Sequence, residues 1–372
     1  MLSAKGEHIR LEAKVQHGLS GFARLYDPRL YRTFLRQATS EYLIRALLLS
    51  KRNNQSRAVI DEAINQIASD NTSGAAEILR QAGAAFTLLS AAPTKQSEAS
   101  FEQAQRAILD ACTALALAQS DMTPLLRLAS AALSASRMAT DAHDCLNLAE
   151  RAALTFIASA DRAAEDAAAH SASLIRDGAT VLTHSRSSTV LSAFVEAKRA
   201  GRNFSVIATE SRPMLEGRSV AAAVAAENIP VTLIADAAAS LAMDGVDLVM
   251  LGADKITPVN LVNKIGTRMI ALAARERKLT LYAVCDSSKF IREDYLGAKL
   301  RQSRSSDELW REAPRGVVVL NSYFERTPLE CFSGIVTEDG LLSITDAARR
   351  AVEASIDIEL AEALGIAQKG IR

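Results

Sequence analysis

Paired cysteines and a surplus of charge of either sign are both missing from this sequence of 372 residues. Its four cysteines are far apart and form no CxxC pair, which argues against a zinc site and provides no disulfide framework. Lys and Arg together number 43, as do Asp and Glu, so the net charge gives no attraction to nucleic acid or to an anionic membrane. We therefore expect a reducing compartment, no metal, no cofactor and no direct binding of nucleic acid.

Long apolar runs without charges are missing as well. The N-terminal stretch MLSAKGEHIRLEAK carries charges throughout and lacks the apolar core of a signal peptide. No later segment stays apolar over the length of a membrane span. Apolar residues nevertheless make up 49% of the chain, and its length is sufficient for two packed domains. These features predict a cytoplasmic protein without membrane contact.

The first part of the chain has few glycines and is rich in helix-forming residues. Only five of the 17 glycines precede Asp177, and this part is rich in Ala, Leu, Arg, Glu and Gln. A helix expected over residues 144–176 leads into the second part. The sequence thus predicts a helical N-terminal domain over residues 1–176.

One segment of this part shows its helical period clearly. Between residues 101 and 115, apolar side chains recur every three or four positions, as in an amphipathic helix. Ser100 lies just before this segment and Gln103 three residues later, which is the spacing of a capping box. Residues 91–100, AAPTKQSEAS, contain a proline and small polar residues and predict a linker between two helices.

After Asp177 the pattern changes to short apolar runs that alternate with helix-length segments such as 188–200 and 261–278. Near-continuous apolar runs are typical of strands buried on both faces of a parallel sheet, and the alternation predicts βαβ units. We therefore predict an α/β fold with a Rossmann-like, mostly parallel sheet domain over residues 177–372. The five runs are ATVLTHS (179–185), FSVIATE (204–210), VTLIAD (231–236), DLVMLGAD (247–254) and LTLYAVCD (279–286).

Polar clusters follow these strands at their carboxyl ends, where doubly wound folds bind ligands. The first cluster contains His184, Ser185, Arg186 and Ser187, directly before a predicted helix. Free N–H groups and the positive end of the helix dipole favour an anion there, so the cluster is a candidate phosphate site. The alternative is an ordinary helix cap made by Ser187 or Ser188.

The second cluster, TESRPMLEGR (209–218), follows the second strand. Pro213 holds Arg212 in an extended conformation, so that the guanidinium could point reproducibly at a phosphate. The alternative is a surface ion pair of Arg212 with Glu210 or Glu216. After the third strand, Asp236 is better explained as a helix N-cap than as a functional acid.

The last cluster lies in GADKITPVNLVNKIGT (252–267). Asp254 ends an apolar strand, where a partly desolvated carboxylate can act as a general acid or base. We expect Asn263 and Lys264 to begin the next helix and to bind a sugar hydroxyl and a phosphate, while Gly266 allows another backbone to approach. The alternative is a salt bridge from Lys264 to Asp254, with Gly266 packed against the sheet.

The same residues carry a family resemblance. The segments DGATVLTHSRSSTVLSAFVEAKRAGRNFSVIATESRPMLEGR, VTLIADAAASLAM, GADKITPVNLVNKIGT, LYAVCDSSKF and NSYFERTP resemble the alpha, beta and delta regulatory subunits of translation initiation factor two-B. That family shares its fold with methylthioribose-1-phosphate isomerase and ribose-1,5-bisphosphate isomerase. The resemblance covers roughly residues 145–360. It implies a helical domain, a Rossmann-like domain that dimerises, and a ligand pocket between the two.

Two departures from the isomerases stand out in these segments. In the isomerases a cysteine follows the Thr-His pair and an aspartate ends the Gly-Ala-Asp strand; Asp254 matches the aspartate, but Ser185 stands in place of the cysteine. A thiol exchanges protons near neutral pH, with a pKa of about 8.5, whereas a serine hydroxyl needs an activating base, which only His184 could supply locally. Pro258 also replaces the Asn-Gly turn that family members commonly have.

The sequence therefore keeps the residues for holding a ligand more completely than those for catalysis. We predict an initiation factor two-B-like protein that binds a sugar phosphate or nucleoside monophosphate. Its partners could include other subunits of a translation factor. The alternative is an aldose-ketose isomerase of the ribose-1,5-bisphosphate or methylthioribose-1-phosphate type, with Asp254 and Ser185 as catalytic residues. Because apolar runs such as GVVVLN (316–321) need to be covered, we also expect a homodimer or a larger even oligomer. The exact ligand stays open.

Overall fold

The computed structural model describes residues 56–70, 73–91, 100–295 and 304–366. All of them belong to one compact unit, Leu49–Arg372. The predictions made for the charged N-terminal stretch, and for most of the linker at 91–100, lie outside the described residues.

Helices form the first part of the described chain, as predicted. Helix α5 begins with the expected capping box: Ser100 Oγ accepts the N–H of Gln103 at 3.2 Å, and the Gln103 side chain accepts the N–H of Ser100 at 3.0 Å. Its buried residues include Ile108, Cys112 and Leu115, which belong to the predicted apolar stripe. The helices are α3 (Ser56–Ser69), α4 (Ala75–Ala91), α5 (Phe101–Ala118), α6 (Thr123–Ser136) and α7 (Ala142–Leu174).

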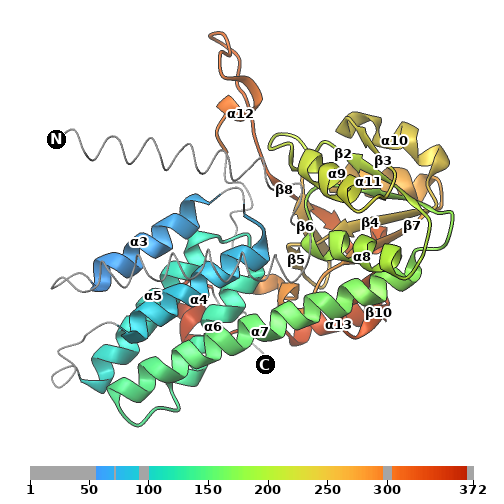
Figure 1. Ribbon diagram of the computed structural model, residues 1–372. Coiled ribbons are helices and arrows are strands. Elements are labelled where there is room, and N and C mark those ends of the chain that lie inside the picture. The colour runs from blue at the N-terminus through green and yellow to red at the C-terminus, as the bar shows by residue number, and fades with distance from the viewer. Residues whose placement is uncertain (1–55, 71–72, 92–99, 296–303, 367–372) are drawn as a thin grey trace, which may run out of the picture. The chain divides into compact units, whose positions relative to one another are not determined.

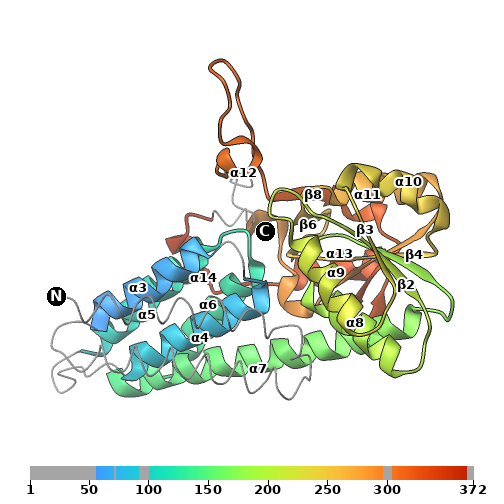
Figure 2. The same cartoon turned by 45° about the horizontal axis from the view of Figure 1, so that its top comes forward.

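A seven-stranded sheet forms the second part, and helix α7 runs from the other helices to this sheet (Figures 1 and 2). The strand order is β10-β9-β7-β4-β1-β2-β3, and every pairing is parallel except that of β10 with β9. The predicted apolar runs all contain strands of this sheet. The strands are β1 (Thr180–Thr183), β2 (Ser205–Thr209), β3 (Val231–Ile234), β4 (Leu248–Gly252), β7 (Thr280–Val284), β9 (Gly334–Thr337) and β10 (Gly340–Leu342).

Helices cover both faces of this sheet. The remaining helices are α8 (Ser188–Arg199), α9 (Glu216–Ala226), α10 (Ala239–Ala242), α11 (Thr267–Glu276), α12 (Asp307–Trp310), α13 (Ile344–Glu353) and α14 (Ile358–Ala363). Neighbouring residues of β1 point to opposite faces, as the pleat of a strand requires. Val181 belongs to a buried cluster that includes residues of α7, α8 and α9, and Leu182 belongs to a second cluster that includes residues of α10, α11 and α13. Burying each such side chain contributes about 1.5–3 kcal/mol.

Two expectations about strands and helices need correction. Strand β3 is not buried on both faces, because it is an edge strand and Leu233 is 44% exposed. The helix expected over 261–278 begins only at Thr267. The run 316–321, which we expect a second copy to cover, is exposed in the single chain: Val318 and Leu320 are 81% and 80% exposed in a segment that projects from the sheet (Figures 1 and 2).

A small antiparallel sheet takes the place of that missing helix start. Its strands are β5 (Lys255–Ile256), β6 (Asn260–Lys264) and β8 (Phe324–Pro328), in the order β5-β6-β8. Thr257 makes the turn into β6, because its hydroxyl accepts the N–H of Asn260 at 2.9 Å and its own N–H bonds to the carbonyl of Asn260 at 2.8 Å. Asn263 and Lys264 therefore end a strand, and they do not begin a helix as predicted.

None of the helices in the described ranges combines the length and the hydropathy that a membrane crossing requires.

Candidate functional site

The carboxyl ends of β1 and β4 lie at the reversal of strand order. The chain runs from β1 outward to β2 and β3 and then returns to β4 on the other side of β1. Such a reversal opens a crevice at the ends of the two neighbouring strands. Gly252, the last residue of β4, lets the loop after β1 come close, since a Cβ at Gly252 would lie 2.7 Å from the Cβ of Ser187. The first and last predicted clusters thus meet at this crevice.

His184, which directly follows β1, is buried beneath the residues of the crevice and is only 1% exposed. Its Nε2 lies 2.8 Å from the carbonyl oxygen of Ile265, which can only accept, so Nε2 carries the proton. Its Nδ1 therefore accepts the hydroxyl proton of Thr209, at 2.6 Å. Burial lowers the pKa of His184, and the carbonyl of Ile265 opposes this effect only in part. Both nitrogens are engaged within the protein, so His184 is not placed to be the activating base that we considered for Ser185.

A carboxylate, Glu216, occupies the place expected for the activating base. Ser185 Oγ donates to Glu216 Oε1 at 2.8 Å, and the same oxygen lies 2.8 Å from the ammonium of Lys264. The Lys264 side chain is only 5% exposed and also lies over the ring of Tyr323, with 5.0 Å between Nζ and the ring centroid. Glu216 Oε2 is buried and has no hydrogen-bond partner among the described residues. A ligand hydroxyl would satisfy that oxygen.

The backbone holds Ser185 in a conformation that few residues adopt. Its φ of 63° lies in the left-handed region, which costs on the order of 1–3 kcal/mol for a residue other than glycine. The Ser185 N–H donates to Ser211 Oγ at 2.8 Å, so the loop after β2 fixes this conformation. Strain of this kind is concentrated at functional sites, and here it directs the hydroxyl toward Glu216.

Asp254 is partly buried among lysine ammonium groups. Burial raises the pKa of Asp254, Lys289 opposes this rise, and the carboxylate of Asp121 adds to it. Lys255, next in the chain, is 5% exposed and donates to the carbonyl of Ser120 at 3.3 Å. Burial also lowers the pKa of Lys255 and raises that of Asp121. A carboxylate with a raised pKa is suited to general acid–base work, and this role for Asp254 stays a prediction.

Strand β6 brings Asn263 and Lys264 to the same region. Asn263 is 5% exposed, and its side-chain N–H donates to Thr267 Oγ1 at 3.0 Å, so part of this amide is engaged within the protein. The salt bridge of Lys264 with Asp254 that we considered is replaced by the pair with Glu216. Gly266 has a φ of 105°, and a Cβ there would lie 3.0 Å from the ring of His184. The close approach at Gly266 is therefore made to an imidazole, and it explains why this position has no side chain.

The remaining residues of the first cluster divide into a cap and an exposed cation. Ser187 Oγ accepts the N–H of Val190 at 3.3 Å and caps α8, which is the structural alternative given above. Arg186 is exposed and reaches toward the start of α4, where a Cβ on Gly74 would lie 3.8 Å from its Nη2. Phosphate binding by either residue stays a prediction.

Arg212 is exposed, and its backbone is fixed by Asp236. The two oxygens of the Asp236 carboxylate accept the N–H groups of Ser211 and Arg212, both at 2.7 Å. Asp236 thus anchors the loop after β2, and it is not the N-cap expected from the sequence. Neither expected ion pair of Arg212 forms, because Glu210 pairs with Arg218 and Glu216 with Lys264. Contact of Arg212 with a phosphate stays a prediction.

Sequence reasoning missed four charged residues of this region. Glu216 entered only as a possible partner of Arg212, and the acidic first turn of α9 was the available signal. Lys255 directly follows Asp254 and could have been noticed for that reason. Asp121 and Lys289 gave no local signal, because they come from the helical part and from the loop after β7.

A helical part followed by a doubly wound sheet, with polar residues gathered at the reversal of strand order, defines a Rossmann-like α/β protein. Residues 71–344 match the model of the Initiation factor 2 subunit family, and the chain belongs to this family.

Some relatives in the family are named as sugar-phosphate isomerases and others as translation initiation factor subunits. A ribose 1,5-bisphosphate isomerase of Methanocaldococcus jannaschii is 35% identical over 191 residues, which is 50% of this chain and 62% of that protein. The translation initiation factor eIF2B subunit alpha of Dictyostelium discoideum is 36% identical over 183 residues, 45% of this chain and 56% of that one. The match therefore spans less than two thirds of either relative.

Solved structures agree on the fold. A translation initiation factor eIF-2B from Pyrococcus horikoshii superposes with a TM-score of 0.64 and 27% identity, over 76% of this chain and 96% of that one. A methylthioribose 1-phosphate isomerase from the same organism gives a TM-score of 0.60 at 23% identity, over 80% and 88% of the two chains. At that identity the second likeness concerns the fold alone.

Proposed function

We propose that this chain is an initiation factor two-B-like protein that holds a sugar phosphate or nucleoside monophosphate in the crevice at the ends of β1 and β4. The observation that carries the proposal is the chain of contacts from Ser185 through Glu216 to Lys264. A serine hydroxyl is much less acidic than a thiol, and the Glu216 oxygen that faces it is already paired with the ammonium of Lys264. These groups suit recognition of ligand hydroxyls better than transfer of protons.

The buried lysines supply the phosphate-binding side of this proposal. Lys255, Lys264 and Lys289 are 5%, 4% and 8% exposed, so their ammonium groups act in a poorly screened environment. The carboxylates of Asp121 and Asp254 have raised pKa values, and burial is the main cause in both. The raised pKa values of these two carboxylates favour their neutral forms, which reduces the negative charge that an anionic ligand meets. We assign Arg186 and Arg212 to the exposed rim of this site.

An aldose-ketose isomerase is the second candidate, and Asp254 favours it. Isomerisation moves a proton between neighbouring carbons, for which a carboxylate of raised pKa is a suitable base. Relatives named ribose 1,5-bisphosphate isomerase support the same candidate. In this candidate Glu216, paired with Ser185, does the work of the absent thiol.

Calorimetry with ribose 1,5-bisphosphate, methylthioribose 1-phosphate and AMP tests binding, and detection of the ketose product tests turnover. We expect saturable binding of at least one compound and no product above background. Arg212→Ala should weaken that binding by about 1.5–3 kcal/mol, the range for a hydrogen bond to a charged group. Arg218→Ala is the control and should leave affinity unchanged, because Arg218 is another exposed arginine of the same segment and pairs with Glu210. Failure of all three compounds to bind would reject the proposal.

Two further variants separate holding from catalysis. Ser185→Cys restores the thiol, and new isomerase activity in this variant would show that only the thiol is missing. Asp254→Asn should alter affinity only modestly in a binding protein, since an amide still bonds a sugar hydroxyl. In an enzyme the same change should lower turnover by roughly a hundredfold to ten-thousandfold. Clear turnover by the parent that disappears in Asp254→Asn would establish the isomerase.

Partner subunits are a separate part of the proposal. Structural neighbours include a tetrameric eIF2B-beta2-delta2 complex from C. thermophilum, at a TM-score of 0.63 and 18% identity, which supports the fold alone. Capture of the tagged chain from its own lysate, followed by mass spectrometry, tests for translation-factor subunits.

A further inference from the structure

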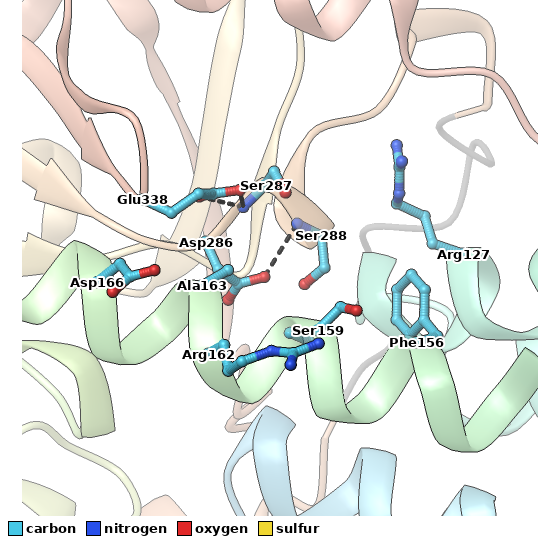
Figure 3. A pocket seen from close by; sticks show the side chains of 11 residues that line it. Arg127, Phe156, Ser159, Arg162, Ala163, Asp166, Asp286, Ser287, Ser288 and Glu338 are labelled. Atoms are coloured by element: carbon cyan, nitrogen blue, oxygen red, sulfur yellow. Dashed lines mark hydrogen bonds between the residues drawn. The ribbon is translucent and has the colours of Figure 1, made fainter.

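A second cavity lies further along the carboxyl edge of the sheet, at the ends of β7 and β9. Its volume is about 390 Å³, within the range of small-molecule sites. The loop after β7, Asp286–Ser288, and Glu338 after β9 form one wall, and helix α7 forms the floor (Figure 3). It shares no lining residue with the crevice described above. The lining residues are Arg127, Phe156, Ser159, Ala160, Arg162, Ala163, Asp166, Asp286, Ser287, Ser288 and Glu338.

The wall of this cavity contains a buried hydroxyl without a partner. Ser288 is 6% exposed, and its Oγ makes no hydrogen bond among the described residues. Figure 3 shows this hydroxyl directed toward the floor, where Ser159 of α7 lies opposite. Leaving a buried hydroxyl unpaired is unfavourable, so a ligand that accepts a hydrogen bond from it is stabilised in the cavity. Arg127, which also lines the cavity, has an unpaired buried Nε–H in the same ranges of the chain.

The carboxylates of the cavity gather toward one end. Asp166 and Glu338 lie at this end with Asp286 between them and the centre, Arg162 lies on the floor near the centre, and Arg127 and Phe156 lie at the other end (Figure 3). Asp286 and Glu338 are fixed in place, because they accept the N–H groups of Ser288 and Ser287 at 2.9 and 3.0 Å. The positions of these two carboxylates are thus set by backbone that does not depend on a ligand.

The sum of the charges selects among ligand classes. Three carboxylates stand against two guanidinium groups, those of Arg127 and Arg162. A phosphate dianion would meet a net negative lining. A simple cation would leave the Nε–H of Arg127 and the hydroxyl of Ser288 without an acceptor, although Nη1 of Arg127 already donates to the carbonyl of Phe290 at 3.1 Å. A molecule with an ammonium group at one end and a carboxylate at the other satisfies both ends.

We propose that this cavity, defined by the residues of α7, the loop after β7 and Glu338, is a second binding site for a small zwitterion that carries an ammonium group and a carboxylate. Its ammonium group lies at Asp286, Glu338 and Asp166. Its carboxylate accepts hydrogen bonds from the hydroxyl of Ser288 and the Nε–H of Arg127. The site is independent of the sugar-phosphate crevice and of the function proposed for it.

Matched probes of different charge test the class of ligand. The zwitterions γ-aminobutyrate, δ-aminovalerate and ε-aminocaproate differ in the separation of their charges, and valerate and n-pentylamine each carry only one of the two. Calorimetry on the full chain should give saturable binding of at least one zwitterion, at least about tenfold tighter than either single-charge probe, because one charged hydrogen bond contributes roughly that much. Absence of binding, or equal binding of n-pentylamine, would overturn the proposal.

Variants place the probe in the cavity. Ser159 is an exposed residue of α7, so Ser159→Phe fills the cavity without disturbing the core and should abolish binding. Ser173→Phe changes another exposed serine of the same helix outside the cavity, and it should bind as the parent does. Asp286→Asn keeps an oxygen for the Ser288 N–H but removes the charge, and it should weaken binding about tenfold to a hundredfold. Unchanged affinity of Ser159→Phe would refute the assignment.

Discussion

At the scale of single residues, Glu216 connects three segments of the crevice. Its carboxylate, in the first turn of α9, contacts the hydroxyl of Ser185 after β1 and the ammonium of Lys264 at the end of β6. Breaking a buried ion pair by removing one partner is costly, because the other charge is left uncompensated. The identity of each residue therefore depends on the other two. A serine at position 185 is compatible with this arrangement because its hydroxyl donates to the carboxylate.

Asp254 gives a prediction about stability and pH. Its pKa is raised in the folded protein, mainly by burial, so folding favours the protonated form. The stability that this group contributes is present below the unfolded pKa, which is about 3.9, and is lost as pH rises through the folded pKa. Asp254→Asn removes the charge and should raise the melting temperature at pH 7. The gain should shrink as pH falls and vanish below about pH 4.

Thermal unfolding of parent and variant between acidic and neutral pH measures this difference. The parent and Asp254→Asn should have converging melting temperatures at the acidic end. A difference that grows toward low pH, or a variant less stable than the parent at pH 7, would contradict the cause assigned to the raised pKa of Asp254.

At the scale of elements, the turn between β6 and α11 packs against the buried imidazole of His184. Gly266 has a φ of 105°, its N–H donates to Glu325 Oε1 at 2.7 Å, and its α-carbon faces the imidazole of His184. Gly266→Ala adds both backbone strain and a Cβ 3.0 Å from that ring. We expect a loss of about 2–4 kcal/mol in the free energy of unfolding, since strain of this kind costs about 1–3 kcal/mol and overpacking adds to it.

Gly178→Ala is the matched control for this prediction. Gly178 also has a positive φ, 79°, but a Cβ there would meet nothing within 4 Å. It should therefore lose only the backbone part, about 1 kcal/mol. Urea unfolding measures both variants. Equal losses would mean that the contact with His184 contributes nothing.

At the scale of the whole molecule, the exposed segment around Val318 and Leu320 bears on assembly. These side chains are 81% and 80% exposed, and Trp310 in the same segment is 50% exposed. Large apolar side chains gathered on a projecting segment are typical of surfaces that another chain covers. We keep the prediction of a homodimer or larger even oligomer, and light scattering at micromolar concentration checks it. Leu320→Asp should shift the protein toward monomer without lowering its melting temperature; a parent that is already monomeric would refute the prediction.

Local pattern in the sequence determined the type and order of most elements. Apolar runs such as 247–254 predicted the parallel strands, because a strand covered on both faces must be apolar along its whole length. The capping box at Ser100 was readable because its partners are three residues apart. Asp254 was found for a similar reason, since the end of a parallel strand marks a ligand-binding edge whatever the other strands do.

Only the tertiary structure decided which of these residues meet. Thr257 turns the chain back, and pairing with β8 makes Asn263 and Lys264 part of a strand, although their sequence suits the start of a helix equally well. Ser185 meets Glu216, which lies 31 positions away. Asp121, from the helical part, is close enough to Asp254 to raise its pKa. Periodicity records only how a segment is buried, whereas these contacts depend on which strand ends become neighbours when the sheet is packed between its helices.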